Sequence, residues 1–349
     1  MLNIDIIFYN SCGWDDVSAV FINSQQSVLS HKIAMQSIGN RLYSCSVDSE
    51  AYDYVYFTCK KGICTVLTSF NRRCYAFMPN GCSFNGIICL EIYHTAPDIP
   101  RIEKITFDYD SKTNKDIYVW TPKGYSENKK KKYGVLYMFD GQNLFYKSST
   151  GYGCWNVHQT MELIGDYIVV AINNGDIYRD SQLTPKLGGV KKKYAEYFSD
   201  GTGVQFAEFL INKIIPYINS NYNVFTDKEY TAICGSSSGG LESFYMGMVY
   251  SQIFGYVGAL SPAFTLYDEQ IWKSFFKELT LDTPPRLYMY IGDNDSAEKE
   301  LSKSIIEMKK YLNNKIGYKS ELIFDYIYDN FHNEACWGGA FIRFADMLK

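Results

Sequence analysis

Six near-continuous apolar runs of strand length between residues 133 and 329 constrain the fold of this chain more than any other feature. They are YGVLYMFDG, YIVVAINNG, EYTAICGSS, GYVGALSPA, PRLYMYIGD and SELIFDYIYD. Runs that are apolar on both faces are typical of buried parallel strands. Segments of helical character separate them, notably 202–219, 238–250 and 297–315. This alternation predicts an α/β fold with a mostly parallel central sheet.

The runs IEKITFDYD and KDIYVWTPKG come just before this region and predict an antiparallel hairpin that leads into the sheet. The first 95 residues differ, because short strand-like runs there are separated by polar turn residues. These runs are IDIIFYN, VSAVFIN, RLYSCSV, YDYVYFTC, GICTVLTS and GIICLEIY. Such spacing predicts an all-β sandwich. The segment TAPDIP at 95–100 reads as a linker, so we expect a β-sandwich over 1–95 and an α/β domain over 101–349.

Charge and composition limit the function classes. The formal net charge is −4 and the basic runs are short, so we expect no nucleic-acid partner. No stretch approaches 18 apolar residues, and the start MLNIDIIFYNS lacks the regions of a signal peptide, so we expect neither a membrane span nor export. Ten cysteines occur without a C-x-x-C pair. We interpret them as reduced thiols of a cytoplasmic protein and expect no metal site and no organic cofactor.

The segment ICGSSSGGLES at 233–243 holds three consecutive serines, and glycine spacing selects one of them. Only Ser237 has glycines two residues before and two residues after it, at Gly235 and Gly239. A strand pattern precedes this serine and a helix pattern follows, as the turn that presents a nucleophilic serine requires. Ser237 is therefore the candidate nucleophile, and the backbone N–H of Ser238 is a candidate oxyanion donor.

A nucleophilic serine needs a base, and His332 is the only histidine that follows Ser237 in the chain. It lies just after the last strand run, where the order Ser, acid, His places the base. The acid is expected after the run PRLYMYIG, where Asp293 and Asp295 both qualify. Either carboxylate could orient the imidazole.

The second oxyanion donor is expected in the loop FDGQNLF at 139–145, which follows the first buried strand run. The backbone N–H of Gln142 or of Gly141 is the candidate. Trp155, a little further along the chain, is a candidate wall of the substrate pocket; a packing position would explain it equally well.

Residues 101 to 349 resemble the esterases of the α/β-hydrolase superfamily, which include esterase D-like, siderophore, feruloyl and acetyl-xylan esterases. The resemblance rests on six segments in order, which are VLYMFDGQNLF, IVVAINNGDIYRDSQLTP, FLINKIIPYINSNYNV, GSSSGG, IGDNDS and HNEACW. It implies an α/β-hydrolase fold in which Ser237 is the nucleophile, His332 the base and Asp295, rather than Asp293, the acid. Ser238 departs from the pattern, since methionine is common there.

The N-terminal part is similar to starch-binding carbohydrate-binding modules in the segments IIFYNSCGWDDVSAVFIN and YDYVYFTC. Trp14 matches a sugar-stacking position of those modules, whereas the stretch near His31 does not match. The resemblance implies a glycan partner for this domain; the alternative is a sandwich that only shapes the hydrolase cleft.

Together these features predict a serine carboxylic-ester hydrolase that acts on acetyl or feruloyl groups of a carbohydrate or on a related small ester. The alternatives are an acyltransferase or siderophore esterase on the same scaffold, a non-catalytic glycan-binding protein, and a scaffold that dimerises through its first domain. Sequence leaves the oligomeric state open.

Overall fold

The computed structural model describes the N-terminal part in segments and most of the remainder continuously. The described N-terminal residues are 3–9, 16–22, 30–39, 42–48, 54–58, 68–69 and 86–90. From residue 101 to 349 it describes all but 111–112, 128–129, 146–153, 175–176 and 199–200. The predicted linker at 95–100 lies outside the described residues, so the domain boundary stays a prediction.

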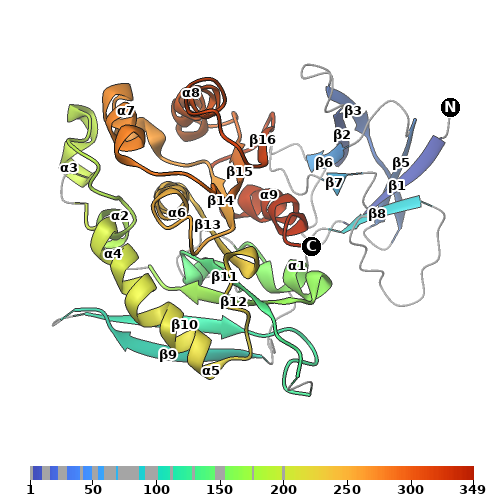
Figure 1. Cartoon of the computed structure of the whole chain (residues 1–349). Coiled ribbons are helices and arrows are strands. Elements are labelled where there is room, and N and C mark those ends of the chain that lie inside the picture. The colour runs from blue at the N-terminus through green and yellow to red at the C-terminus, as the bar shows by residue number, and fades with distance from the viewer. Residues whose placement is uncertain are drawn as a thin grey trace.

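The described residues of the N-terminal part form two four-stranded sheets (Figure 1). One has the order β4-β5-β1-β8 and the other β3-β2-β6-β7. Their strands are β1 (Asn3–Tyr9), β2 (Ser18–Ile22), β3 (Ser30–Ala34), β4 (Gln36–Gly39), β5 (Leu42–Asp48), β6 (Tyr54–Thr58), β7 (Thr68–Ser69) and β8 (Gly86–Leu90). Side chains of both sheets share one buried cluster, in which Phe8 of β1 stacks on Phe57 of β6 with ring centroids 4.3 Å apart. A shared core between two sheets is the packing that the sandwich prediction requires.

An eight-stranded sheet of order β16-β15-β14-β13-β11-β12-β10-β9 organises the rest of the chain. Its strands are β9 (Ile102–Asp108), β10 (Asn114–Trp120), β11 (Gly134–Met138), β12 (Tyr167–Ile172), β13 (Thr231–Ser236), β14 (Tyr256–Leu260), β15 (Arg286–Ile291) and β16 (Leu322–Tyr326). The strands from β11 to β16 pair in parallel, whereas β10 runs antiparallel to both neighbours. The entry hairpin and the six parallel strands of the sequence prediction are confirmed. Five of these strands are mostly buried, whereas β16, at the edge of the sheet, is half-buried.

Helices cover both faces of this sheet. They are α1 (Val157–Ile164), α2 (Arg179–Gln182), α3 (Ala195–Phe198), α4 (Gly203–Phe209), α5 (Ile215–Asn221), α6 (Ser238–Val249), α7 (Glu269–Glu278), α8 (Ser296–Tyr311) and α9 (Glu334–Asp346). Shorter helical segments are Gly141–Asn143, Lys192–Tyr194, Leu210–Ile214, Lys228–Tyr230, Phe264–Leu266 and Leu312–Ile316. The predicted helices at 202–219, 238–250 and 297–315 correspond to α4 to α5, α6, and α8 with its π-helical extension.

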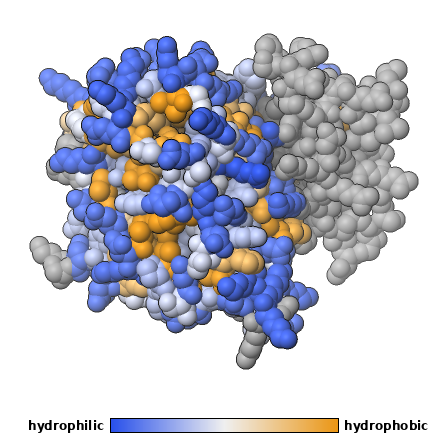
Figure 2. All heavy atoms as spheres, viewed as in Figure 1, coloured by the Kyte–Doolittle hydropathy of each residue, from blue (hydrophilic) through white to orange (hydrophobic). Residues whose placement is uncertain are grey.

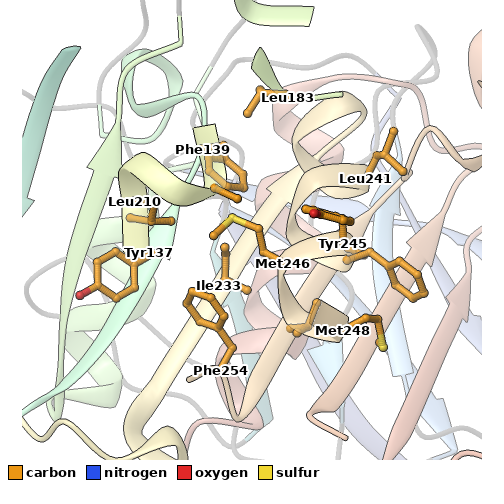
Figure 3. Close-up of a cluster of buried hydrophobic side chains, with 14 of the residues drawn as sticks. Tyr137, Phe139, Leu183, Leu210, Ile233, Leu241, Tyr245, Met246, Met248 and Phe254 are labelled. Carbon is orange, nitrogen blue, oxygen red and sulfur yellow. The ribbon is translucent and has the colours of Figure 1, made fainter. Parts of the chain in front are cut away.

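Alternate residues of each strand enter two separate cores, one on each face of the sheet. Side chains of α4 to α8 pack in the first core, which also holds Ile233 of β13. Figure 3 shows Leu241 and Met246 of α6 in the same cluster as Ile233. Helices α1 and α9 pack against the other face, which includes Ala232 and Cys234 of the same strand. Figure 2 shows that hydrophilic residues cover most of the outer face toward the viewer, with hydrophobic patches between them.

Candidate active site

Ser237 lies on the turn between β13 and α6, as predicted from its glycine spacing. Its backbone has φ 57° and ψ −122°, a conformation that is strained for a residue with a side chain. Two hydrogen bonds hold this turn, because Ser237 donates its N–H to Leu260 at 2.9 Å and accepts from the N–H of Ala263 at 3.2 Å. A Cβ at Gly235 would lie 2.6 Å from the carbonyl oxygen of Gly239. Glycine is therefore required where strand and helix meet.

The imidazole of His332 lies between the serine hydroxyl and a buried carboxylate. Its Nε2 is 3.0 Å from Ser237 Oγ, and its Nδ1 is 3.2 Å from Glu298 Oε1. The ring also makes an edge contact with Trp337 at 4.7 Å between centroids. The Glu298 side chain is fully buried, whereas the His332 side chain is 19% exposed. The array thus has one fully buried end, at Glu298, and one partly exposed end, at Ser237.

Asp295, which the family resemblance implies as the acid, occupies a different position. Its Oδ1 accepts the N–H of Glu298 at 2.9 Å and caps α8, and its Oδ2 accepts the backbone N–H of His332 at 2.6 Å. Asp293, the other candidate, accepts the N–H of Asp329 at 2.7 Å. The expectation that either aspartate faces the imidazole is corrected, because one first-turn residue of α8, Glu298, fills that position.

A network of donors holds the Glu298 carboxylate in place. Ser261 Oγ donates to Oε1 at 2.6 Å, and the N–H of Gly292 donates to Oε2 at 3.2 Å. Trp337 Nε1 in turn donates to Ser261 Oγ at 3.0 Å. A sequence signal for this arrangement exists in DSAE at 295–298, since an aspartate followed three residues later by a glutamate marks a helix N-terminus. That spacing indicates that Asp295 caps the helix, and a capping carboxylate is held at the backbone instead of facing the imidazole.

Gln142 lies in the 3-10 helix Gly141–Asn143, directly after β11 and Asp140. Its side chain is fixed at both ends, since Nε2 donates to Asp140 Oδ1 at 3.2 Å and Oε1 accepts the N–H of Asn174 at 3.1 Å. A Cβ at Gly141 would lie 2.9 Å from a backbone carbon of Ala171. The loop that carries the candidate oxyanion donor is thereby held against β12.

Arg179 of α2 connects this loop to the turn at Ser237. It binds Asp140 through Nε and Nη2 at 2.6 and 2.7 Å, and its Nη1 lies 2.8 Å from Asp180 Oδ1. The same carboxylate oxygen of Asp180 accepts from Ser238 Oγ at 3.2 Å. Burial alone would lower the pKa of Arg179, but the two carboxylates raise it above its ordinary value. A permanent cation therefore joins the two elements from which the oxyanion donors are expected.

Glu334, at the start of α9, is a further carboxyl group on this side of the site. Its Oε1 accepts from Asn143 Nδ2 at 3.0 Å, so it connects α9 to the loop that follows β11. Burial raises its pKa to about 7, and the nearby Asp140 charge acts in the same direction.

The two predicted substrate-binding tryptophans have different outcomes. Trp155 is 1% exposed and packs between Trp337 and Phe341, which is a core position. The Trp155 ring therefore does not form a pocket wall, and its position agrees with the packing alternative. Trp14 lies outside the described residues, so its predicted contact with sugar stays a prediction.

No group of three histidine, cysteine, aspartate or glutamate side chains suitable for a metal ion occurs within the described segments. Over those same residues, the structure contains no helix whose length and hydrophobicity would let it cross a lipid bilayer.

Comparison with known proteins gives both a family and a fold. Residues 111–345 match the family model described as Esterase. The chain is 26% identical over 232 residues to an endo-1,4-beta-xylanase/feruloyl esterase of Xylanibacter ruminicola, a match that covers 63% of this chain and 28% of that protein. The chain spans less than half the length of the curated relatives that it matches.

Two solved structures illustrate the likeness in fold. A CE1 ferulic acid esterase from Anaeromyces mucronatus is 23% identical with a TM-score of 0.52, over 72% of this chain and 92% of that one. The enterobactin esterase FES from Shigella flexneri is 12% identical with a TM-score of 0.55, over 99% of this chain and 92% of that one. The second match extends over the N-terminal sheets, whereas the first does not cover the whole chain.

Proposed function

We propose that this chain, which belongs to the Esterase family through its match over residues 111–345, is a carboxylic ester hydrolase that cleaves its ester through a covalent intermediate on Ser237. The observation that carries the proposal is the 3.0 Å separation of Ser237 Oγ and His332 Nε2 at a strained strand–helix turn. In the first step Oγ attacks the ester carbonyl carbon while Nε2 takes the hydroxyl proton. His332 then gives that proton to the departing alcohol, and water releases the acid by the same two proton transfers.

We assign Glu298, not Asp295, as the acid of this triad. The 3.2 Å contact with His332 supports a tautomer in which Nδ1–H points at the carboxylate, so that Nε2 is free to accept a proton. The fully buried carboxylate would then stabilise the imidazolium that forms during the reaction. Asp295 is proposed to position the array, because it holds both the start of α8 and the backbone of His332.

The oxyanion is assigned to two backbone N–H groups, those of Ser238 and of Gln142. Ser238 is the first residue of α6, where the free N–H groups and the dipole of the helix favour negative charge. The hydrogen bonds that Arg179 makes with Asp140 and Asp180 support a rigid separation of the two donors. Donors that are fixed before the reaction stabilise the developing charge without reorganisation.

Turnover of p-nitrophenyl acetate, butyrate and octanoate by wild type and Ser237→Ala tests this assignment. Hydrolysis should fall to the uncatalysed background in Ser237→Ala, with circular dichroism unchanged. Activity that survives the substitution contradicts the assignment, and an inactive wild type on every ester would favour a non-catalytic glycan-binding protein.

As substrate we propose an acetyl or feruloyl ester of a carbohydrate, because the curated relative at 26% identity carries both xylanase and feruloyl esterase in its name. A siderophore ester is the second candidate, and the observation that favours it is the fold likeness to an enterobactin esterase across 99% of this chain. Product analysis with acetylated xylan, methyl ferulate and enterobactin separates the two. An acyl group recovered on an added alcohol instead of as free acid would indicate an acyltransferase.

We also propose a glycan partner for the N-terminal sheets and a cytoplasmic location for the protein. The second rests on Cys154 and Cys234, which are buried free thiols within the described part of the chain. Loss of binding to insoluble starch or xylan in Trp14→Ala would support the first. Sugar binding that persists in Trp14→Ala, or that is absent from both wild type and variant, would oppose a glycan partner. Light scattering on the whole chain would show whether the protein is a dimer.

A further inference from the structure

A pocket of about 700 Å³ lies between α4, α2 and the turn that joins β9 to β10. Its volume is within the range of small-molecule sites. Ser181 and Gln182 of α2 line it, and they follow directly after Asp180, which accepts a hydrogen bond from Ser238 next to the nucleophile. Helix α2 therefore contacts the serine turn through one residue and the pocket through the next two.

Two residues that line this pocket each carry a buried side-chain oxygen without a hydrogen-bond partner within the described residues. These oxygens are Gln182 Oε1 and Thr113 Oγ1, and the Gln182 residue is only 3% exposed. A buried carbonyl oxygen without a donor costs free energy, so a site that keeps one is poised to accept a hydrogen bond from something that enters. The Gln182 carbonyl oxygen requires a donor such as an O–H group of a ligand, whereas the Thr113 hydroxyl can either donate or accept.

The remaining lining residues combine aromatic rings with polar side chains. Tyr109, Tyr178 and Phe209 supply rings, of which Tyr178 is 49% exposed and Phe209 only 6% exposed. Exposed amide groups come from Gln205 and Asn212. Apolar ring faces beside planar hydrogen-bonding groups match a molecule that has C–H surfaces and many hydroxyl groups.

The charges of the lining argue against an anionic ligand. Asp110 and Glu208 are acidic, and Lys213 is the basic residue among those that line the pocket. Lys213 already donates to the carbonyl oxygen of Asp108 at 3.0 Å. The net negative charge of the lining would repel a phosphate or a carboxylate, whereas it would not repel a neutral sugar.

We propose that this pocket binds the neutral oligosaccharide portion of the ester, so that glycosyl units occupy it while their acyl group reaches Ser237. This inference rests on the proposed function and specifies the alcohol side of the substrate. It assigns to Gln182 a role in recognising a sugar hydroxyl and to the exposed Tyr178 ring a role in stacking.

Binding to the whole 349-residue chain with Ser237→Ala tests the proposal, with xylohexaose and maltohexaose as probes in isothermal titration calorimetry. In that background Gln182→Met removes the unpartnered oxygen with little change in shape, and Gln205→Ala removes an exposed amide. Each substitution should raise the Kd for the bound sugar about tenfold or more, and a tenfold rise corresponds to a loss of about 1.4 kcal/mol in binding free energy. Gln270→Ala, an exposed glutamine of α7 outside this pocket, is the matched control and should leave the Kd unchanged.

Kinetics of the same variants with Ser237 restored separates this inference from the proposed function. The ratio of kcat/KM for an acetylated xylo-oligosaccharide to that for p-nitrophenyl acetate should fall about tenfold through KM, while Tm does not fall in Gln182→Met. Three results overturn the inference even if Ser237→Ala is inactive. The ratio could be unchanged in both pocket variants, or neither xylohexaose nor maltohexaose could bind. As a third result, 2,3-dihydroxybenzoate, added as an anionic probe, could bind more tightly than either sugar. If Gln182→Met does not fold, Gln205→Ala decides. Turnover that persists in Ser237→Ala instead overturns the proposed function.

Discussion

At the residue scale, the structure differs from the sequence prediction in the carboxylate that faces His332 Nδ1, which is Glu298 instead of an aspartate. Sequence places the serine and the base by spacing and chain order, and both fall within 3.0 Å of each other. Chain order alone does not select among three carboxyl groups within six residues, because which of them faces the ring depends on the first turn of α8. There Asp295 bonds to backbone N–H groups and Glu298 points inward.

Glu298→Gln should lower kcat about 10²- to 10⁴-fold, because the amide cannot stabilise the imidazolium as a carboxylate does. Asp295→Ala removes the cap of α8, so its main effect should be a loss of about 0.5–2 kcal/mol in stability. Steady-state kinetics on p-nitrophenyl acetate and thermal unfolding of both variants check this. A larger loss of kcat in Asp295→Ala than in Glu298→Gln would show that the acid is Asp295.

Arg179→Met should reduce both activity and stability, because it leaves the Asp140 carboxylate unpaired at a position where the side chain is 6% exposed. Breaking a buried ion pair typically costs about 3–5 kcal/mol. Arg286→Met is the control, since its pair with Glu321 is 3.7 Å long and about half-exposed on both sides. Equal Tm and kcat/KM in the two variants would refute a linking role for Arg179.

At the scale of elements, the turn from β13 to α6 depends on close contact between backbones. A Cβ at Gly240 would lie 2.7 Å from the carbonyl oxygen of Leu260, which is backbone of the neighbouring β14 and has little freedom to move. The glycine signal in the sequence is therefore a packing requirement as well as a mark of the nucleophile.

Gly240→Ala should destabilise the protein by about 1–3 kcal/mol, as overpacking of a filled site does. Gly189→Ala provides the comparison, because no atom lies within 4 Å of the Cβ that it would add. Urea unfolding midpoints of the two variants measure the difference. A Gly240→Ala protein as stable as Gly189→Ala would mean that the turn adapts.

Strands that are apolar on both faces were predictable because burial on two sides leaves a continuous pattern, as in YIVVAI of β12. The strands β3 and β4 were not predicted as strands. Their sequences, SHKIA and QSIG, are short and mostly polar, and the two strands pair with different sheets on either side of Met35. Pairing with partners distant in sequence, rather than local pattern, determines such elements.

At the scale of the whole molecule, the buried Glu334 couples stability to pH. Its pKa is raised from 4.5 to about 7, so between these values the folded protein keeps a proton that the unfolded chain releases. Stability from this group therefore falls as pH rises through that window and stays at its lower level above it.

Glu334→Gln should remove this component, which is on the order of 3 kcal/mol for a shift of this size. The variant keeps an amide oxygen that can accept from Asn143 Nδ2. Chemical denaturation of wild type and variant at pH 5 and pH 8 checks it, with the exposed residue Glu278 changed to Gln as the control. The same pH dependence in all three proteins would contradict a buried, protonated Glu334.

The central claim is that the acyl group passes through Ser237, and intact-protein mass spectrometry after rapid acid quench of p-nitrophenyl butyrate turnover tests it most directly. We predict a single butyryl adduct that maps to the peptide containing Ser237 and is absent from Ser237→Ala. An adduct on another residue, or p-nitrophenol release at the wild-type rate by Ser237→Ala, would contradict the account.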